Sequence, residues 1–587
     1  MEEQLIATDM NTQTVADQNT FNQQAELKAA ALLASTALLA ACGGSNTTAQ
    51  NDTGSNAAMA APPEQPAPAP DPSAAAITAS EAARFLAQAS MGTSRAQIAR
   101  VQALGYAGWI DEQLSLPGNG TRWDWLVSKG FNDISYRNSQ AGFDSTAWRK
   151  LISSPDTLRQ RFTLALSEII VVSIDGLIDG GWKAFAAAAW LDMLEVNCFG
   201  NYRGLLQIVS TSPAMGQYLT FRGNAKYNAQ TGAMPDENYA RELMQLFSIG
   251  LLELKLNGTP RQQDGKNIET YDLTDITGLA RIFTGWDFDL AGGKADKPDF
   301  LHRPMTQVPI RHETGASTFL DKTVGEGLNG ADALSAALDI IFAHDNVAPF
   351  ISRQLIQRLV TSNPSTGYVS RVATVFNDDG SGSASKKGNL TAVLKAILLD
   401  DEARKPANLS DPQFGKLREP MLRFLAWARA YNVTATNDIW NLGNTSDPAT
   451  RLGQSPLRSP SVFNYFRPGY VPPNTAIAAA SLVAPELQIT NESSVVGYVN
   501  YMQRAISSGI SDLVPDYSSL TPLADTAPAL LDEINLVLAA GQLSAATLQN
   551  LSTAVDSMPR GTDTRRKQRI YAALTLVLAA PEFIVLK

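Results

Sequence analysis

Apolar residues recur along most of the chain with the three- to four-residue spacing of amphipathic α-helices. In residues 157–172, for example, Leu158, Phe162, Ala165 and Ile169 fall on one helical face. The same spacing predicts helices over 331–344, 347–360, 390–399, 417–430, 478–489, 494–506, 527–540 and 564–578. Alternating strand patterns are scarce, so we expect a mainly α fold built as one large all-helical domain.

Residues 285–330 interrupt this pattern. They contain many Gly, Pro, Asp and Lys residues and little helical periodicity, and the residues around Val308 suit a short hairpin. Long ordered loops in compact domains tend to carry function. We therefore expect a small irregular or β-hairpin insertion near 285–330.

The beginning of the chain has a different character. The apolar run 29–41 is shorter than the roughly 20 residues that cross a bilayer, and it ends in Leu39-Ala40-Ala41-Cys42. Its length and small final residues fit a signal peptide, and the pattern resembles a bacterial lipoprotein signal, in which the cysteine becomes the lipidated first residue. The acidic residues before the run depart from that pattern. The alternative is a buried alanine-rich helix that ends in cysteine.

The residues after Cys42 are mostly Gly, Ser, Asn, Thr, Ala and Pro up to the first predicted helix. Such a composition has too little apolar bulk to form a core. The sequence therefore predicts a signal peptide (1–41), a disordered tether (42–77) and a helical domain (78–587). Gly43, with no aspartate after the cysteine, resembles outer-membrane sorting, so we expect an exported lipoprotein of the cell envelope.

Charge and motifs narrow the classes of function. The net charge is −10 and the isoelectric point is about 5.1, which argues against nucleic acid as a partner because phosphate binding needs clustered Lys and Arg. The chain has no phosphate loop, dinucleotide fingerprint or Gly-x-Ser-x-Gly elbow, so we expect no nucleotide cofactor. If Cys42 is lipidated, Cys198 stands alone among apolar neighbours, and we expect it to be buried and inert.

Several segments together resemble a known bacterial family. They are ARFLAQA (83–89), GNYR (200–203), PAM (213–215), PDENYAREL (235–243), ARIFTGW (280–286), GKLREP (415–420), PSVFNYF (460–466) and APEF (580–583). The set is similar to domain of unknown function 1800, from about residue 80 to the end. The resemblance implies export and a partner from an exported family related to alkaline phosphatases and sulfatases, because the genes of the two families are commonly neighbours. It assigns no activity, cofactor or catalytic residue that could be carried over to this chain.

The segment 237–250 carries one group of candidate residues. As a helix it would place Glu237 and Arg241 on a polar face as an i,i+4 pair, with Asn238 and Glu242 on a partly buried flank. A partly buried glutamate needs a partner or a raised pKa. Glu242 is therefore either paired with Arg241, Arg281 or Arg418, or acts as a general acid or base or as a metal ligand.

A second group of candidates follows in the chain. Asp272, Asp275 and Asp287 precede the insertion, and all three histidines, including His312, lie within residues 302–344. Histidine with carboxylates suits acid–base chemistry or a metal site, although the spacing matches no compact metal motif. Thr274 is expected to cap the helix that follows. Four tryptophans that lie by turns or loops are expected near the surface: Trp123, Trp125, Trp182 and Trp286.

Two hypotheses for function follow. In the first, the protein binds or scaffolds an exported partner through residues such as Asn238, Arg241 and Trp286. In the second, it is a hydrolase or lyase acting on extracellular polysaccharide. Its acid and base would then be Glu242 and one of Asp272, Asp275 or Asp287, with His312 assisting.

Overall fold

The computed structural model describes residues 76–384 and 386–587. Cys42, the predicted signal peptide and almost all of the predicted tether lie outside the described residues.

Helices make up most of the described chain, as the apolar spacing predicted. They are α2 (Ala79–Ala89), α3 (Arg95–Ser115), α4 (Arg122–Ser128), α5 (Phe143–Ser153), α6 (Thr157–Ser167), α7 (Lys183–Asn197), α8 (Tyr202–Ser210), α9 (Pro213–Tyr218), α10 (Asn238–Gln245), α11 (Leu273–Ile282), α12 (Gly330–Ala343), α13 (Val347–Leu359), α14 (Thr366–Asn377), α15 (Leu390–Leu399), α16 (Asp401–Arg404), α17 (Pro420–Ala430), α18 (Ala476–Ala479), α19 (Glu492–Ser508), α20 (Ala527–Ala539), α21 (Ala545–Asp556), α22 (Asp563–Ala579) and α23 (Pro581–Ile584). The prediction of a mainly α fold is confirmed.

The strands form only small antiparallel pairs in the described chain. The pairs are β1 (Gln262–Gln263) with β2 (Lys266–Asn267), β3 (Trp286–Asp287) with β4 (Thr306–Gln307), β5 (Ser317–Phe319) with β6 (Lys322–Val324), β7 (Lys416–Leu417) with β10 (Val585–Leu586), and β8 (Thr434–Ala435) with β9 (Leu513–Val514). Two of these pairs, β3–β4 and β5–β6, lie within 285–330. The predicted small insertion is therefore confirmed.

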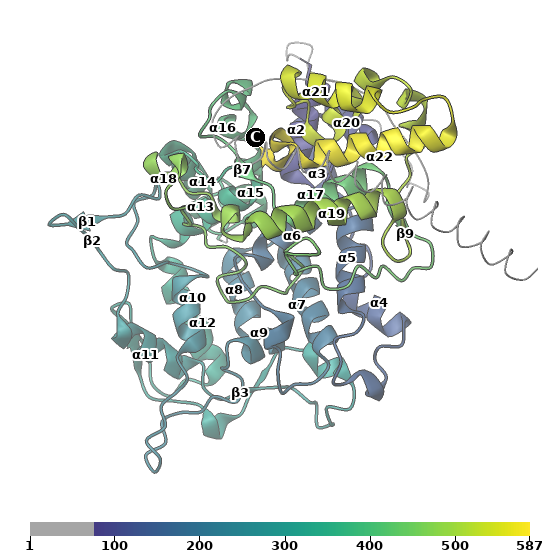
Figure 1. Cartoon of the computed structure of the whole chain (residues 1–587). Helices are drawn as coiled ribbons and strands as arrows, with labels where there is room; N and C mark the ends of the chain where they lie inside the picture. The colour runs from purple at the N-terminus through teal and green to yellow at the C-terminus, as the bar shows by residue number, and fades with distance from the viewer. Residues whose placement is uncertain (1–75, 385) are drawn as a thin grey trace, which may run out of the picture.

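One hydrophobic core runs from α2 to α23. Figure 1 shows α20, α21 and α22 at one end of the molecule beside α2 and α3, with α5, α6 and α7 in the middle and the β3 region at the opposite end. Among the described helices, no single one has the length and apolar composition of a membrane span. Helices α12 and α13 have that length and composition only when they are taken together, and the pair is bent by 77°.

The predicted helix boundaries fail where proline intervenes. The spacing predicted α15 with its observed bounds and α13 to within one residue. The predicted helix 478–489 is wrong, because α18 ends at Ala479 and a short 3₁₀ helix follows at Pro485–Ile489. Pro485 has no N–H to continue a helical ladder, and it disfavours helical geometry in the residue before it.

The two ends of the described chain meet. β10, next to the C-terminus, pairs with β7 in the GKLREP segment. In addition, the Arg84 guanidinium of α2 donates to the backbone oxygen of Lys587 at 3.2 Å and to that of Ala403 at 2.7 Å. These contacts hold the C-terminal residues against β7 and α2.

A cluster of ionisable side chains lies sealed beside β7. The Lys416 ammonium lies 3.0 Å from a carboxylate oxygen of Glu486 and 3.5 Å from one of Glu419, and it donates to the backbone oxygen of Arg358 at 2.9 Å. Gln454 donates to the other oxygen of Glu419 at 2.8 Å. All of these residues are buried, so each charge depends on its partners within the cluster.

Glu168, just after α6, adds a third carboxyl to this cluster. Its two oxygens are buried and accept no hydrogen bond from a described donor, although Arg358 lies 3.6 Å away. The Glu168 carboxyl lies within hydrogen-bonding reach of Glu419. Burial and the charge of Glu419 raise the pKa of Glu168 well above its usual range. Burial alone would raise the pKa of Glu419, but Lys416 and the hydrogen bond from Glu168 outweigh it and lower the pKa to about 2. The raised pKa of Glu168 and the lowered pKa of Glu419 therefore favour a protonated Glu168 beside an ionised Glu419.

The different pKa shifts of Glu168 and Glu419 predict unequal losses of stability for two matched substitutions. Glu419→Gln removes one of the two carboxylates that pair with the buried Lys416, and we expect a loss of about 3–5 kcal/mol in the free energy of unfolding. Glu168→Gln keeps a neutral hydrogen-bond donor of similar shape, and we expect a change below about 1 kcal/mol. Urea unfolding of both variants measures the difference. Equal losses would show that Glu168 is ionised in the folded chain.

Candidate functional site

Glu242 lies on α10, whose two flanks differ as the sequence predicted. Tyr239 and Leu243 are buried in the core. On the polar side, Arg241 pairs with Glu237 at 3.1 Å, which confirms the predicted i,i+4 pair. The helix is shorter than expected and ends at Gln245, because Ser248 turns its hydroxyl back to the Leu243 carbonyl at 2.5 Å.

The Glu242 carboxyl is buried without an ion pair. Glu242 is only 7% exposed, and its Oε2 accepts no hydrogen bond from a described donor. The expected ion pair with Arg241, Arg281 or Arg418 does not form. Each arginine contacts another group: Arg241–Glu237, Arg281–Glu313 and Arg418–backbone oxygen of Leu538.

Two tyrosines lie near this carboxyl. Burial raises the pKa of Glu242, and Arg241 only partly offsets the effect. Burial also raises the pKa of Tyr218 and of Tyr271 to about 12, and the neighbouring Glu242 carboxylate adds to both shifts. The Tyr218 hydroxyl lies within reach of Ser459, beside the PSVFNYF segment. Two segments separated by about two hundred residues of sequence thus meet at Tyr218.

A group of hydrogen-bonded polar side chains lies near the beginning of α10, one helical turn before Glu242. Asn238, one helical turn before Glu242, is exposed, and its amide donates to the Thr220 hydroxyl at 3.4 Å. Thr220 donates to Asp236 at 3.0 Å, and the Asn224 side chain accepts from the Asp236 backbone N–H at 2.9 Å. We call Tyr218, Thr220, Asn238, Glu242 and Tyr271 the Glu242 site.

Asp272 has a structural role that the sequence assigned to another residue. It is the N-cap of α11, and one of its carboxylate oxygens accepts from the backbone N–H of Thr274 at 2.6 Å and of Asp275 at 3.2 Å. Asp275 completes a capping box by accepting from the Asp272 N–H at 2.9 Å. The prediction that Thr274 caps this helix is therefore wrong, because a carboxylate at Asp272 already satisfies the free N–H groups.

Asp287 and His312 are each held by local partners. Asp287 pairs with Arg311 at 2.8 Å and with Arg222 at 3.3 Å. The His312 ring is buried, with Nδ1 at 3.1 Å from the Thr284 backbone oxygen, while its Nε2 contacts no described hydrogen-bond partner. The His312 ring is thus closed off from solvent, and the half-buried Asp287 carboxylate is paired with two arginines.

The tryptophans predicted to be near the surface are mostly buried. Trp286 is 4% exposed and Trp182 is 1% exposed, so the expected surface position of Trp286 is wrong. Its strand β3 pairs with β4, which turns the indole into the core. Trp123 alone of the expected surface set stays half-buried, with its ring 4.3 Å from that of His302. Cys198 is buried as predicted, and burial raises its pKa to about 12.

The structure does not join the four residues proposed for catalysis. No hydrogen bond or ion pair between described residues connects any two of Glu242, Asp272, Asp287 and His312. Likewise, no group of three or more described His, Cys, Asp or Glu side chains lies close enough to hold a metal ion.

What sequence reasoning missed is the set of groups around Glu242. Tyr218, Tyr271 and Ser459 come from distant segments, and no spacing in the sequence connects them.

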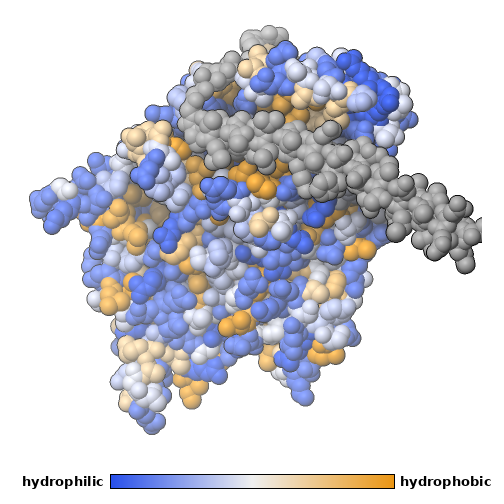
Figure 2. Space-filling model, viewed as in Figure 1, coloured by the Kyte–Doolittle hydropathy of each residue, from blue (hydrophilic) through white to orange (hydrophobic). Residues whose placement is uncertain are grey.

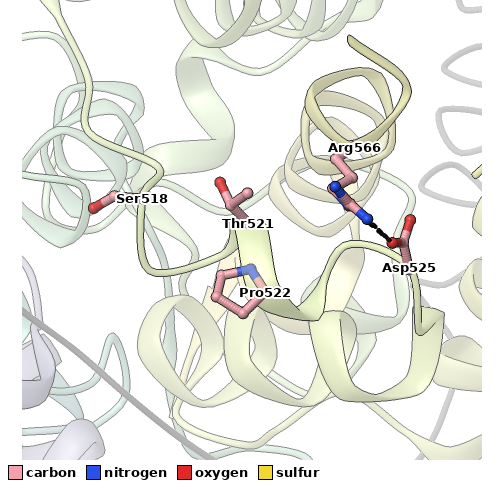
Figure 3. A pocket seen from close by; sticks show the side chains of 5 residues that line it. All are labelled: Ser518, Thr521, Pro522, Asp525 and Arg566. Carbon is pink, nitrogen blue, oxygen red and sulfur yellow. Dashed lines mark hydrogen bonds and ion pairs between the residues drawn. The ribbon is translucent and has the colours of Figure 1, made fainter. Parts of the chain in front are cut away.

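A shallow depression of about 410 Å³ lies at the opposite end of the molecule from the β3 region. It is lined by Ser518, Thr521, Pro522, Asp525 and Arg566. Figure 3 shows Arg566 directed at Asp525, and the closest approach of the two charged groups is 2.7 Å. Because the strongest charges of its wall neutralise each other, the depression offers a ligand mainly hydroxyl groups.

The buried Glu242 carboxyl predicts a specific pH dependence. Because its folded pKa is raised, the folded chain binds this proton more tightly than the unfolded chain. The contribution of this proton to the free energy of unfolding is complete below the ordinary glutamate pKa of about 4.3. It is lost as the pH rises through the raised pKa of Glu242 in the folded chain. We expect Glu242→Gln to unfold at higher urea than the wild type near neutral pH, with no difference in acid. Glu237→Gln, at the half-buried paired neighbour, is the control. If Glu242→Gln instead unfolds at lower urea than the wild type at neutral pH, the result would contradict the absence of an ion pair at Glu242.

Comparison with known proteins identifies the family of the chain. No curated protein and no solved structure was found to match it. A family model described as "Protein of unknown function (DUF1800)" matches residues 84–585, which begins within α2 and ends in β10. The match therefore spans the closed fold, both sequence segments that meet at Tyr218, and the buried cluster around Lys416. The chain belongs to the DUF1800 family of proteins of unknown function.

Proposed function

We propose that this protein is an exported, lipid-anchored protein of the cell envelope that acts by binding. The observation that carries the proposal is the Leu39-Ala40-Ala41-Cys42 segment at the end of an apolar run, followed by a stretch rich in small residues and proline. Acyl chains on Cys42 would hold the helical domain at the outer membrane. Two lipid chains anchor a protein far more stably than one.

The proposed activity is scaffolding for an exported partner of the alkaline-phosphatase and sulfatase type. The support for a binding role is the exposed polar end of the Glu242 site, where Asn238, Thr220 and Asn224 present amide and hydroxyl groups. Such groups form hydrogen bonds across an interface without the cost of burying a charge.

Substituting the cysteine tests the anchor. Cys42→Ser removes the thiol that would be acylated, and we expect the protein to move from the membrane fraction to the soluble periplasmic fraction and to lose incorporated palmitate. Cys198→Ser is the matched control, since that thiol is buried, and it should keep both properties. Unchanged membrane association of the Cys42→Ser protein would refute the anchor.

A second function has one observation in its favour. A buried carboxyl with a raised pKa, facing two tyrosines, suits a general acid. In this alternative the protein cleaves extracellular polysaccharide, and Glu242 protonates the leaving group. Asp272 or Asp287 would supply the base only after a rearrangement, because each is engaged locally.

Polysaccharide cleavage by the lipidated protein would test this alternative. If Glu242 is the acid, Glu242→Gln lowers the release of reducing ends by about 10²–10⁴-fold while the protein stays folded. Glu237→Gln on the other flank of α10 should retain activity. Equal activity of wild type and Glu242→Gln would eliminate Glu242 as the acid.

A further inference from the structure

Basic side chains gather at the beginning of α22, although the whole chain is acidic. Arg560, Arg565 and Lys567 are exposed, and Arg566 is half-buried. We call these four residues the α22 basic patch. Figure 2 shows hydrophilic side chains over the outer end of the α21–α22 pair. Three of the four cations occupy the first turns of the helix, where the helix dipole disfavours positive charge, so helix stability does not explain their position.

Nearby acids neutralise only part of this charge. Asp556 contacts Arg560 at 3.1 Å and the buried Arg569 at 2.8 Å. Arg566 lies between Asp525 at 2.7 Å and Asp563 at 3.2 Å. Five cations thus face three carboxylates, and no described carboxylate forms an ion pair with Arg565 or Lys567. The patch keeps a net positive charge within a chain of net charge −10.

The position of the patch relates it to the predicted anchor. α2, the first described helix, packs on α20, and α20 packs on α22; Figure 1 shows these helices at the same end of the molecule. The residues between Cys42 and α2 span up to about 120–130 Å when fully extended. An anchor at Cys42 therefore allows this end of the domain to contact the membrane but does not require it.

We propose that the α22 basic patch docks on the anionic headgroups of the membrane in which the protein is anchored. The interaction orients the domain, with α20–α22 facing the lipid and the β3 region facing away (Figure 1). This inference rests on the proposed anchorage for its biological setting. An anionic surface is the occupant that the charges favour, because Arg565 and Lys567 are exposed and form no ion pair with a described carboxylate, and neighbouring Arg and Lys side chains can contact a layer of phosphates together.

Vesicle binding tests the docking without the acyl chains. The full chain carrying Cys42→Ser is sedimented with phosphatidylcholine vesicles that contain or lack phosphatidylglycerol. The patch variant is Arg560→Gln/Arg565→Gln/Lys567→Gln. The charge-matched control is Lys266→Gln/Lys294→Gln/Lys322→Gln, which removes three exposed lysines elsewhere in the domain. Thermal unfolding checks that both variants keep the fold, and the leader contributes equally to all three proteins.

We expect the Cys42→Ser chain to prefer the anionic vesicles and to lose that preference in high salt. Each neutralised cation of the patch should lower partitioning about fivefold, so the patch variant should lose about 100-fold, while the control variant binds as before. Equal losses in the two variants would overturn the proposal, because net charge alone would then explain binding. Equal binding to neutral and anionic vesicles would also overturn it and leave an acidic protein as the occupant.

The experiments distinguish a failure of the proposed anchor from a failure of the proposed docking. Absence of palmitate on Cys42 together with patch-dependent binding to anionic vesicles would refute the anchor alone. Palmitate on Cys42 with equal binding by the patch and control variants would refute the docking alone.

Discussion

The structure depends on a lysine sealed in its core. Lys416 lies where an unpaired ammonium would be strongly destabilising, so Glu419, Glu486 and the Arg358 backbone oxygen must all reach it. These partners come from α13, the start of α17 and the segment before α19. Lys416 itself belongs to β7, which pairs with β10, so the same constraint also holds the C-terminus in place.

Two buried glutamates in this protein lack an ion pair with good geometry, and they differ in what surrounds them. Glu168 lies inside the buried cluster beside Glu419, and the charge of Glu419 adds to the effect of burial on the Glu168 pKa. Glu242 lies near Tyr218 and Tyr271, one helical turn from the exposed Asn238. Burial raises the pKa of both carboxyls, but only Glu242 lies next to a turn of helix with an exposed polar side chain.

Sequence periodicity predicted the helices that bury one regular apolar face, such as α13, α15 and α20, because that spacing depends only on residues within a turn or two. It failed where side chains override the pattern. Pro485 ended a predicted helix, and Ser248 shortened α10 by capturing a backbone carbonyl. Asp272 took the capping position predicted for Thr274, because its carboxylate accepts from two N–H groups.

The sequence by itself determined the mainly α class, the small insertion near 285–330, the i,i+4 pair of Glu237 with Arg241, and the burial of Cys198. Each of these follows from local composition or spacing. Only the tertiary structure decided that Asp272, Asp287 and His312 have separate local partners, that Trp286 is buried, and that Tyr218 and Tyr271 surround Glu242. The reason is that the environment of a charged or aromatic side chain is set by segments far away in the chain, and their approach is fixed by packing around the common core rather than by neighbouring residues.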